Sequence, residues 1–261
     1  MRTVTGLLGV EHCRGLPSAR MHDVDRAGWT TLLGLADDEV PRLLVLEGTW
    51  WRQRALDTRL PHLTGVRELG MPDLWHGWLG EVPVAYCPAY GAPRAVEPVH
   101  ALAVCGTPVV VQVGSCGGLQ PAVRTGDVVL SEQACIGEGA SQYYGGHGSS
   151  PADAALVDAA AGLLAARGVP VHRGTTVSTS ALLQQPDDLV ASWAAAGHLG
   201  VDMETSAVFS ATAHFDLRAA SLLFVWDELP GRSWTDPFSP AEQAAQAAAN
   251  AAVFEVALQL R

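Results

Sequence analysis

The stretch that most constrains the fold is Val109–Leu130, which reads VVVQVGSCGGLQPAVRTGDVVL. It opens with a β-branched apolar run that one polar residue, Gln112, interrupts. A short run of this kind is typical of a strand buried on both faces. Gly114–Gly118 follows with three glycines in five residues, and we expect a loop there whose backbone can approach a ligand closely. A turn then leads into a second β-branched run, Val128–Leu130, which predicts the next strand.

This layout favours a ligand site at the carboxyl end of a sheet. Ser115 adds a hydroxyl donor beside backbone amides that could hold an anion. A tight loop between two core strands would explain the same residues without any ligand. Neither GxxxxGK[ST] nor GxGxxG is present, so the stretch is neither a P-loop nor a dinucleotide fingerprint.

Composition indicates one large α/β domain over residues 1–261, with 1–40 as a poorly patterned, variable N-terminal segment. Of the 261 residues, 48% are hydrophobic and 16% charged, which is enough apolar material for a single sizeable core. The 16 basic and 27 acidic residues give a net charge of −11. This charge argues against a nucleic acid as partner but leaves room for a local basic pocket.

The five cysteines form no CxxC pair, and most lie in or beside apolar segments. Buried free thiols in a reducing cytoplasm fit this pattern best. The sequence contains no convincing export signal, no apolar run long enough to span a membrane, and no metal-ligand spacing. We therefore expect a cytoplasmic protein without a membrane segment or a metal site.

Two arginines stand where an anion could bind. Gly48 ends the predicted strand Pro41–Glu47, and Arg52 follows four residues later, so the pair could clamp a phosphate, although Arg52 could equally be solvated. Arg94 follows Pro93 at the start of a predicted helix, where an anion is favoured and a cation has no structural reason to be.

Carboxylates gather at two further strand ends. Gly200–Phe209 passes from strand to helix, with Asp202 and Glu204 on either side of Met203. These acids could hold a polyol above the methionine, or they could simply complement the helix dipole. Asp227 ends the last apolar strand, where a catalytic acid is expected in an α/β sheet.

The remaining pattern predicts an alternation of strands and helices. The further strands expected are Val66–Leu69, Trp75–Tyr86 with a turn at Gly80-Glu81, Val128–Cys135, Val171–Ser178 and Arg218–Asp227. The helices expected are Trp29–Leu35, Gln53–Leu60, one from Tyr90 to about Val104, Ala152–Arg167, Asp187–Ala196, and one from a capping box at Ser239 to about Leu260.

Four motifs in order give the chain a resemblance to a known family: GSCGGLQPAVRTGDVVL, EGASQYY, GVDMETSAVF and LLFVWD. The chain resembles, over about Leu44–Leu258, the nucleoside phosphorylase superfamily of hexameric purine nucleoside phosphorylases, uridine phosphorylases and related nucleosidases. The resemblance implies a phosphorylase/hydrolase-like fold, a twisted mixed sheet partly closed like a barrel and flanked by helices. It also implies cleavage of an N-glycosidic bond, with inorganic phosphate as co-substrate and no cofactor. Members form dimers, trimers or hexamers with sites at subunit interfaces.

The resemblance also implies roles for individual residues. It implies that phosphate binds at Gly48, Arg52 and Ser115, and that Arg67 reaches a neighbouring subunit's phosphate. The residues implied for the ribose are Met203, Glu204 and His22. The residues implied for the base are Gly117, Leu183, Asp202 and Trp226. The resemblance makes Asp227 the acid that protonates the leaving base.

Departures from the family pattern leave the nucleophile open. Gln112 stands where the phosphorylases usually have an arginine, and GTWWR replaces GDPxR. Our hypothesis is that Arg94 compensates for Gln112. We expect a purine-type nucleoside phosphorylase; a nucleosidase that uses water and a non-enzymatic nucleoside-binding protein are the alternatives.

Overall fold

The computed structural model describes residues 20–229, 231–232 and 235–261. The strands are β1 (Leu43–Gly48), β2 (Thr64–Glu68), β3 (Trp75–Leu79), β4 (Val82–Pro88), β5 (Val109–Gly118), β6 (Val128–Gly137), β7 (Ser149–Pro151), β8 (Val171–Thr179), β9 (Gly200–Asp202) and β10 (Arg218–Glu228). The α-helices are α1 (Arg26–Leu33), α2 (Arg52–Arg59), α3 (Ala92–Cys105), α4 (Ala154–Ala165), α5 (Asp187–Ala195), α6 (Thr205–His214) and α7 (Pro240–Ala257).

The ten strands form one mixed sheet that closes on itself at one end. Its order is β10-β6-β8-β9-β5-β1-β4-β3-β2, with β7 paired to β6 and a further pairing between β10 and β5. That last pairing joins β10, β6, β8, β9 and β5 into a closed ring, while β1, β4, β3 and β2 extend from it as an open sheet. The predicted α/β fold with a partly barrel-like sheet is therefore confirmed.

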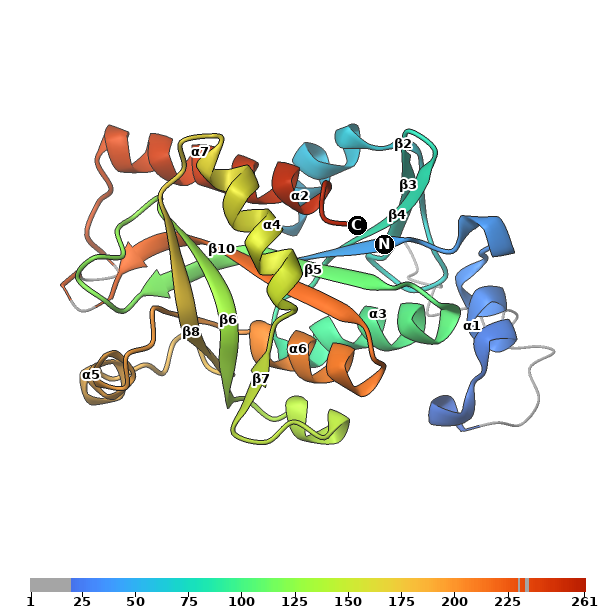
Figure 1. Ribbon diagram of the computed structural model, residues 1–261, viewed down its shortest axis with the longest axis horizontal. Helices are drawn as coiled ribbons and strands as arrows, with labels where there is room; N and C mark the ends of the chain where they lie inside the picture. The colour runs from blue at the N-terminus through green and yellow to red at the C-terminus, as the bar shows by residue number, and fades with distance from the viewer. Residues whose placement is uncertain (1–19, 230, 233–234) are drawn as a thin grey trace, which may run out of the picture.

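The central strands are buried on both faces, and their side chains enter two cores in alternation. Leu43 and Val45 of β1 belong to one core with residues of α4 and α7, whereas Leu44 and Leu46 belong to the other with residues of α3 and α6. Figure 1 shows α4 and α7 on one side of the sheet and α3 and α6 on the opposite side. This double burial explains why these strands are continuous apolar runs rather than alternating ones.

The predicted loop at Gly114–Gly118 is wrong, because these residues continue β5. β10 pairs with β5 in parallel as far as Gly118, and β9 pairs with Gly117 and Gly118 from the other side. Glycines here serve close packing, since a Cβ at Gly118 would lie 3.1 Å from the Val123 carbonyl oxygen. The loop that turns the chain back toward β6 begins only after residue 118.

Short polar side chains cap the starts of two helices, α4 and α7. The Ser239 hydroxyl accepts from the Glu242 amide while the Glu242 carboxylate accepts from the Ser239 amide, so the predicted capping box is confirmed. The Asp153 carboxylate accepts from the Leu156 amide at 2.8 Å, which makes Asp153 the cap and starts α4 two residues later than predicted. The predicted loop over Gly137–Ser150 also contains a 3₁₀ turn, Ser141–Tyr144, and the start of β7.

The N-terminal segment predicted as 1–40 lies partly outside the described residues. From residue 20 onward it contains α1, which packs against α3, and two 3₁₀ turns, Met21–Asp23 and Asp37–Glu39. No helix in the described part of the chain is long and apolar enough to cross a membrane.

Candidate functional site

Glu204 lies buried where the carboxyl ends of β1 and β4 meet the start of α6. Its Oε1 accepts from the Gly91 amide at 2.6 Å, one of the free N–H groups at the start of α3. A Cβ at Gly48 would lie 2.5 Å from Glu204 Oε2, so any larger residue here would displace this carboxylate. Burial and the nearby Asp202 charge together raise the pKa of Glu204 to about 8.

Asp202 is also buried, and its carboxylate is already surrounded by donors. Oδ1 accepts from the Ser178 hydroxyl at 2.6 Å, and Oδ2 accepts from the amide and hydroxyl of Thr205 at 2.8 and 2.5 Å. Burial raises the pKa of Asp202, while these hydrogen bonds lower it. Asp202 therefore holds the start of α6 in place beside Glu204, and its predicted role in binding the base stays a prediction.

The polar residue in β5, Gln112, belongs to the same buried network. Its amide oxygen lies 2.7 Å from the Thr205 hydroxyl oxygen and accepts from the Ser221 hydroxyl, and its amide nitrogen lies 3.4 Å from Asp202 Oδ2. Gln112 is fully buried. It joins β5, β10 and α6, so its side chain already has protein partners on both ends.

Asp227 lies on β10 at the same end of the sheet, opposite Gly117 of β5. The β10–β5 pairing contains a bulge at residue 226, after which Asp227 Oδ1 lies 3.4 Å from where a Gly117 Cβ would be. Burial raises the pKa of Asp227, and the positive charge of Arg232 acts in the opposite direction. A carboxyl group with a raised pKa is suited to donating a proton.

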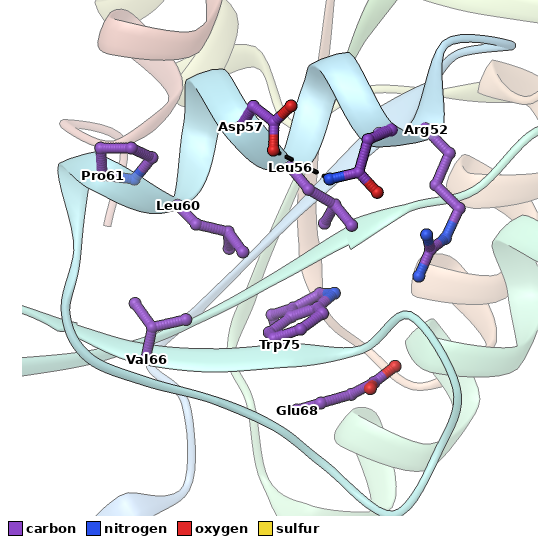
Figure 2. Close-up of a pocket in the computed structure, with 9 residues that line it drawn as sticks. Arg52, Leu56, Asp57, Leu60, Pro61, Val66, Glu68 and Trp75 are labelled. Carbon is purple, nitrogen blue, oxygen red and sulfur yellow. Dashed lines mark hydrogen bonds between the residues drawn. The ribbon is translucent and has the colours of Figure 1, made fainter.

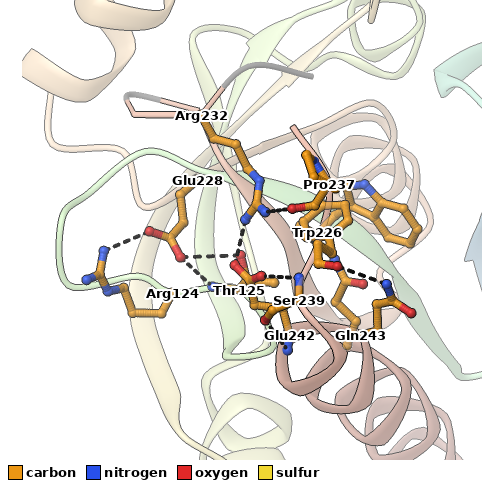
Figure 3. Close-up of polar contacts among 11 residues, drawn as sticks. Arg124, Thr125, Trp226, Glu228, Arg232, Pro237, Ser239, Glu242 and Gln243 are labelled. Atoms are coloured by element: carbon orange, nitrogen blue, oxygen red, sulfur yellow. Dashed lines mark hydrogen bonds and ion pairs between the residues drawn. The ribbon is translucent and has the colours of Figure 1, made fainter. Parts of the chain in front are cut away.

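The chain on both sides of Asp227 is held by polar contacts (Figure 3). Before it, the Trp226 carbonyl accepts from the Gln246 side chain of α7 at 2.5 Å. After it, the Glu228 carboxylate accepts from Arg124 at 2.7 Å and from the Thr125 amide at 3.1 Å. Asp227 therefore sits on a strand end that is fixed from two directions.

Arg52 and Arg94, which are both predicted to bind phosphate, contact the same turn at Pro72-Asp73. Arg52 pairs with Asp73, and Arg94 donates to the Pro72 carbonyl oxygen and, at 2.6 Å, to Glu97. Asp73 has a φ of 62°, a left-handed conformation that aspartate and asparagine tolerate better than most residues. The contacts of Arg94 do not overlap with those of Gln112, so compensation between them stays a hypothesis.

A groove lies on the outer side of Arg52, between α2 and the β2–β3 hairpin (Figure 2). It has a volume of about 670 Å³. Its lining residues are Arg52, Gln53, Leu56, Asp57, Leu60, Pro61, Val66, Glu68 and Trp75. Neither Glu204 nor Asp227 lines it, so the groove is separate from the carboxylates described above.

An aromatic pair that the sequence reasoning did not assign lies next to Glu204. The rings of Trp50 and Tyr90 are 5.6 Å apart and tilted by 59°. Tyr90 directly precedes Gly91, whose amide binds Glu204, and the Glu204 charge helps burial to raise the pKa of the Tyr90 phenol. The turn Tyr90–Gly91–Ala92–Pro93 was the sequence signal that could have located this position. The backbone N–H groups at a helix start have no partner within the helix, so they can bind a carboxylate.

The other predicted site residues fall into three groups. Ser115 is exposed beside Gly114, the partner of Gly48, and Met203 is half-buried next to Glu204. The Trp226 ring packs against the rings of Phe224 and Phe238, with centroids 6.3 and 5.7 Å apart. The residues in exposed or partly exposed positions elsewhere are Arg67, which pairs with Glu39 at 2.7 Å, His22, which pairs with Asp23 at 3.1 Å, and Leu183, which is 78% exposed.

No group of three or more His, Cys, Asp or Glu side chains that could hold a metal ion occurs within residues 20–229, 231–232 and 235–261. The site is instead a row of glycine and serine positions with one buried carboxylate, Glu204, and one partly buried carboxylate, Asp227. In sheet order, Asp227 stands on β10, Gly117 and Ser115 on β5, and Gly48 on β1, with Glu204 against Gly48. Such a row can hold a ligand between a proton donor and a hydrogen-bond acceptor.

Comparison with known proteins finds similarity to enzymes named as nucleoside phosphorylases. The chain is 30% identical to a guanosine phosphorylase of Halorubrum lacusprofundi over 52% of its length and 56% of the relative's. It is 32% identical to a DeoD-type purine nucleoside phosphorylase of Geobacillus kaustophilus over 48% of its length and 53% of the relative's. The chain thus spans about half the length of these two relatives. A DeoD-type enzyme of Jannaschia sp. is 26% identical and matched over 88% of its length, against 77% of this chain.

Among solved structures, uridine phosphorylase from Vibrio fischeri ES114 superposes with a TM-score of 0.74 at 23% identity, over 87% of this chain and 93% of that one. This likeness concerns the fold. The sequence profile of the phosphorylase superfamily matches residues 60–258, which include β5, Glu204 and Asp227 but not Gly48 and Arg52. Since this match covers most of the chain, the protein belongs to the phosphorylase superfamily.

Proposed function

We propose that the protein cleaves the N-glycosidic bond of a nucleoside by phosphorolysis, releasing the free base and ribose 1-phosphate. The observation that carries the proposal is the position of two carboxylates, the buried Glu204 and the partly buried Asp227, at one end of the sheet. They lie on either side of the glycine-containing end of β5, where a nucleoside would contact backbone rather than side chains.

The two carboxylates suit opposite parts of the reaction. As the glycosidic bond lengthens, the sugar becomes cationic and the base anionic. A proton from Asp227, whose pKa is raised by burial, would neutralise the leaving base, a contribution of typically about 10²–10⁴-fold. Glu204 would accept hydrogen bonds from the 2′- and 3′-hydroxyls and so fix the sugar's orientation.

Phosphate would attack C1′ from the side opposite the base. Gly48, Ser115, Arg52 and Arg94 are the groups proposed to hold it, and Arg67 is proposed to act at a neighbouring subunit's site. Phosphate binding at Arg52 requires this guanidinium to exchange Asp73 for phosphate, since the two are paired. Exchange of a partly exposed ion pair is inexpensive, because such pairs contribute only about 0–1 kcal/mol.

A purine nucleoside is the proposed substrate class. The support is the aspartate at the base end of the site and the similarity to enzymes named guanosine and purine nucleoside phosphorylase. His22, Leu183 and Trp226 keep their proposed roles at the ribose and the base. We further propose a cytoplasmic homo-oligomer. Free thiols at Cys87, Cys105, Cys116 and Cys135 suit a reducing compartment.

Hydrolysis is a second candidate that one observation favours. Each arginine proposed for phosphate already contacts a carboxylate: Arg52 with Asp73, Arg67 with Glu39 and Arg94 with Glu97. If these pairs persist, water rather than phosphate would attack the sugar.

One assay separates the candidates. The protein is incubated with inosine, adenosine and uridine, with and without phosphate, and free base is measured. Phosphate-dependent release of purine together with ribose 1-phosphate supports the proposal, whereas release that ignores phosphate identifies a hydrolase. Tight binding without release identifies a nucleoside-binding protein and contradicts both enzyme assignments.

A further inference from the structure

A polar residue, Gln246, lies in the face of α7 that is buried against the sheet. The helix packs against β10 and β5 (Figure 1). Gln246 is only 6% exposed. The other buried residues of this helix are apolar: Ala249, Ala252, Val253, Phe254, Val256 and Ala257. Burying an amide side chain is unfavourable unless the amide is hydrogen-bonded, so the partner of Gln246 explains its position.

This partner is the carbonyl oxygen of Trp226, the extra residue of the bulge in β10. The side-chain amide of Gln246 donates to it at 2.5 Å. The register of β10 against β5 skips Trp226 and resumes with Asp227 opposite Gly117. A bulge redirects the side chain that follows it, and its unpaired residue needs hydrogen-bond partners from outside the ladder. Because the Trp226 carbonyl belongs to the peptide unit that leads into Asp227, its partner also fixes the backbone of Asp227.

The strand on either side of the bulge is held by backbone contacts instead. The Val225 amide donates to the Asp127 carbonyl oxygen at 2.8 Å, and the Leu229 amide donates to the Gly118 carbonyl oxygen at 3.0 Å. Loss of the Gln246 contact would therefore loosen the bulge without releasing the strand before or after it. The residue that follows the loosened carbonyl is the proposed proton donor.

The charges around Asp227 come from other residues. Burial raises the pKa of Asp227, and the positive charge of Arg232 lowers it. On β5, burial, helped by the Asp227 charge, raises the pKa of the Cys116 thiol. The next residue of β10, Glu228, is paired with Arg124. The amide on α7 is uncharged, so it can act on Asp227 only through geometry.

We propose that Gln246 is a positioning residue: by holding the Trp226 carbonyl, it fixes the direction in which the Asp227 carboxyl points toward the leaving base. This inference rests on the proposed function, which makes Asp227 the proton donor. Errors in such a direction are costly, because a displacement of about 1 Å can lower a rate about 10²-fold.

The test is a double-mutant cycle between Gln246→Met and Asp227→Asn. Methionine keeps the length of glutamine but cannot donate a hydrogen bond. Gln246→Met should lower kcat for inosine by about 10–100-fold with little change in KM, since the proposed sugar contacts at Glu204 remain. In the Asp227→Asn background the same substitution should change kcat by no more than about twofold, because the group that it positions is already lost.

Gln243→Met is the matched control. Gln243 lies about one turn earlier on α7 and donates to the Phe238 carbonyl oxygen at 2.9 Å, but in an exposed position. This variant should keep the kcat of the wild type, and urea unfolding checks that each variant is folded in the assay. The inference is overturned by a wild-type kcat in Gln246→Met, by the same loss in Gln243→Met, or by an equal loss from Gln246→Met in both backgrounds.

Gln246→Glu keeps the shape of the side chain and makes its donor depend on pH. An ionised carboxylate cannot donate to the Trp226 carbonyl, whereas the protonated acid can. Burial raises the pKa of such a carboxyl above its ordinary value of about 4.3. The ratio of its kcat to that of the wild type should therefore rise several-fold as pH falls from 8 to 5, while the ratio for Gln246→Met stays constant. A constant ratio for both variants contradicts the inference.

Failure of the proposed function is recognised separately. If the wild type cleaves no nucleoside, the carboxyl titration of Asp227 is followed by carbon NMR, with its signal assigned by comparison with Asp227→Asn. Gln246→Met should move the pKa of Asp227 toward the ordinary aspartate value, because a loosened bulge admits water, and Gln243→Met should leave it unchanged. The same titration in the wild type and in Gln246→Met would contradict the inference whether or not the protein is an enzyme.

Discussion

At the scale of single residues, the buried Glu204 and the partly buried Asp227 are two carboxyl groups that need opposite protonation states. Glu204 must be ionised to accept hydrogen bonds from sugar hydroxyls, whereas Asp227 must be protonated to give its proton to the base. Burial raises both pKa values, and the pKa of Asp227 is lowered in turn by the positive charge of Arg232. Substrate hydroxyls would favour ionised Glu204, because hydrogen bonds to a charged form stabilise it.

Asp227→Asn tests the proton donor. The amide is similar in size but cannot supply an acidic proton, so kcat for a purine nucleoside should fall about 10²–10⁴-fold while KM changes much less. Steady-state kinetics on inosine measure both constants. Unchanged turnover by this variant would remove Asp227 from the mechanism.

The raised pKa of Glu204 predicts a specific pH dependence of stability. Between the ordinary carboxyl pKa near 4.5 and the folded value of about 8, the folded state binds more protons than the unfolded one. The contribution of Glu204 to stability is therefore fully present below the ordinary pKa and decreases as pH rises through this window, by up to about 1.4 kcal/mol per pH unit. Urea unfolding from pH 5 to 8 should show this decrease in the wild type and a flatter profile in Glu204→Gln. The same slope in both proteins would contradict the assignment.

Asp73→Asn tests whether Arg52 is a phosphate ligand. Asparagine keeps the side-chain shape and tolerates the left-handed backbone at residue 73, but it removes the charge that holds the guanidinium. If phosphate must displace Asp73, the variant should show a several-fold lower KM for phosphate, since an exposed pair contributes up to about 1 kcal/mol. The nucleoside KM is the internal control. A phosphate KM that does not fall argues that Arg52 has no part in binding.

At the scale of elements, the site depends on how closely the end of β1 approaches the start of α6. A Cβ at Gly48 would lie 2.5 Å from Glu204 Oε2, and Gly91 holds the other oxygen of this carboxylate. The carboxylate is thus held between two backbone segments.

Gly48→Ala should therefore displace the Glu204 carboxylate and raise the nucleoside KM by about tenfold or more, the loss expected for one sugar hydrogen bond to a charged group. Gly162→Ala is the matched control, because Gly162 lies in α4 with open space around its Cβ position. The control should keep its KM and gain up to about 1 kcal/mol in unfolding free energy from better helix propensity. Equal KM values for the two variants would show that Gly48 does not support Glu204.

The elements with strong patterns could be predicted from the sequence, and the contacts between them could not. Apolar runs and the Ser239 capping box gave strands and helices close to those observed. Gly114–Gly118 was misjudged because local glycine content indicates a loop, while pairing with β10 and β9 on both sides keeps it extended. Gln112 and Trp50 gained their partners only through tertiary contacts with Thr205 and Tyr90, which spacing does not encode.

At the scale of the whole molecule, a buried ion pair joins the elements that surround Gly48. Glu47 precedes Gly48 and binds Arg59 of α2 through both oxygens, at 2.9 and 3.1 Å. Arg59 also donates to the Asn250 side chain of α7 at 2.5 Å, and the Tyr86 hydroxyl of β4 donates to Glu47 at 2.7 Å. The pair therefore connects β1, β4, α2 and α7, and both charged side chains are almost completely buried.

Removing one member of this pair should destabilise the entire fold, because the other charge stays buried without its partner. Arg59→Met should lower the free energy of unfolding by about 3–5 kcal/mol. The double variant Glu47→Gln/Arg59→Met should lose clearly less, since it leaves no unpaired charge. Urea unfolding with matched m-values measures both changes. If Arg59→Met unfolds like the wild type, the pair does not hold these elements together. If the double variant is as unstable as the single one, lost packing accounts for the effect instead of charge, because the Arg59 guanidinium lies 4.7 Å from the centre of the Phe254 ring.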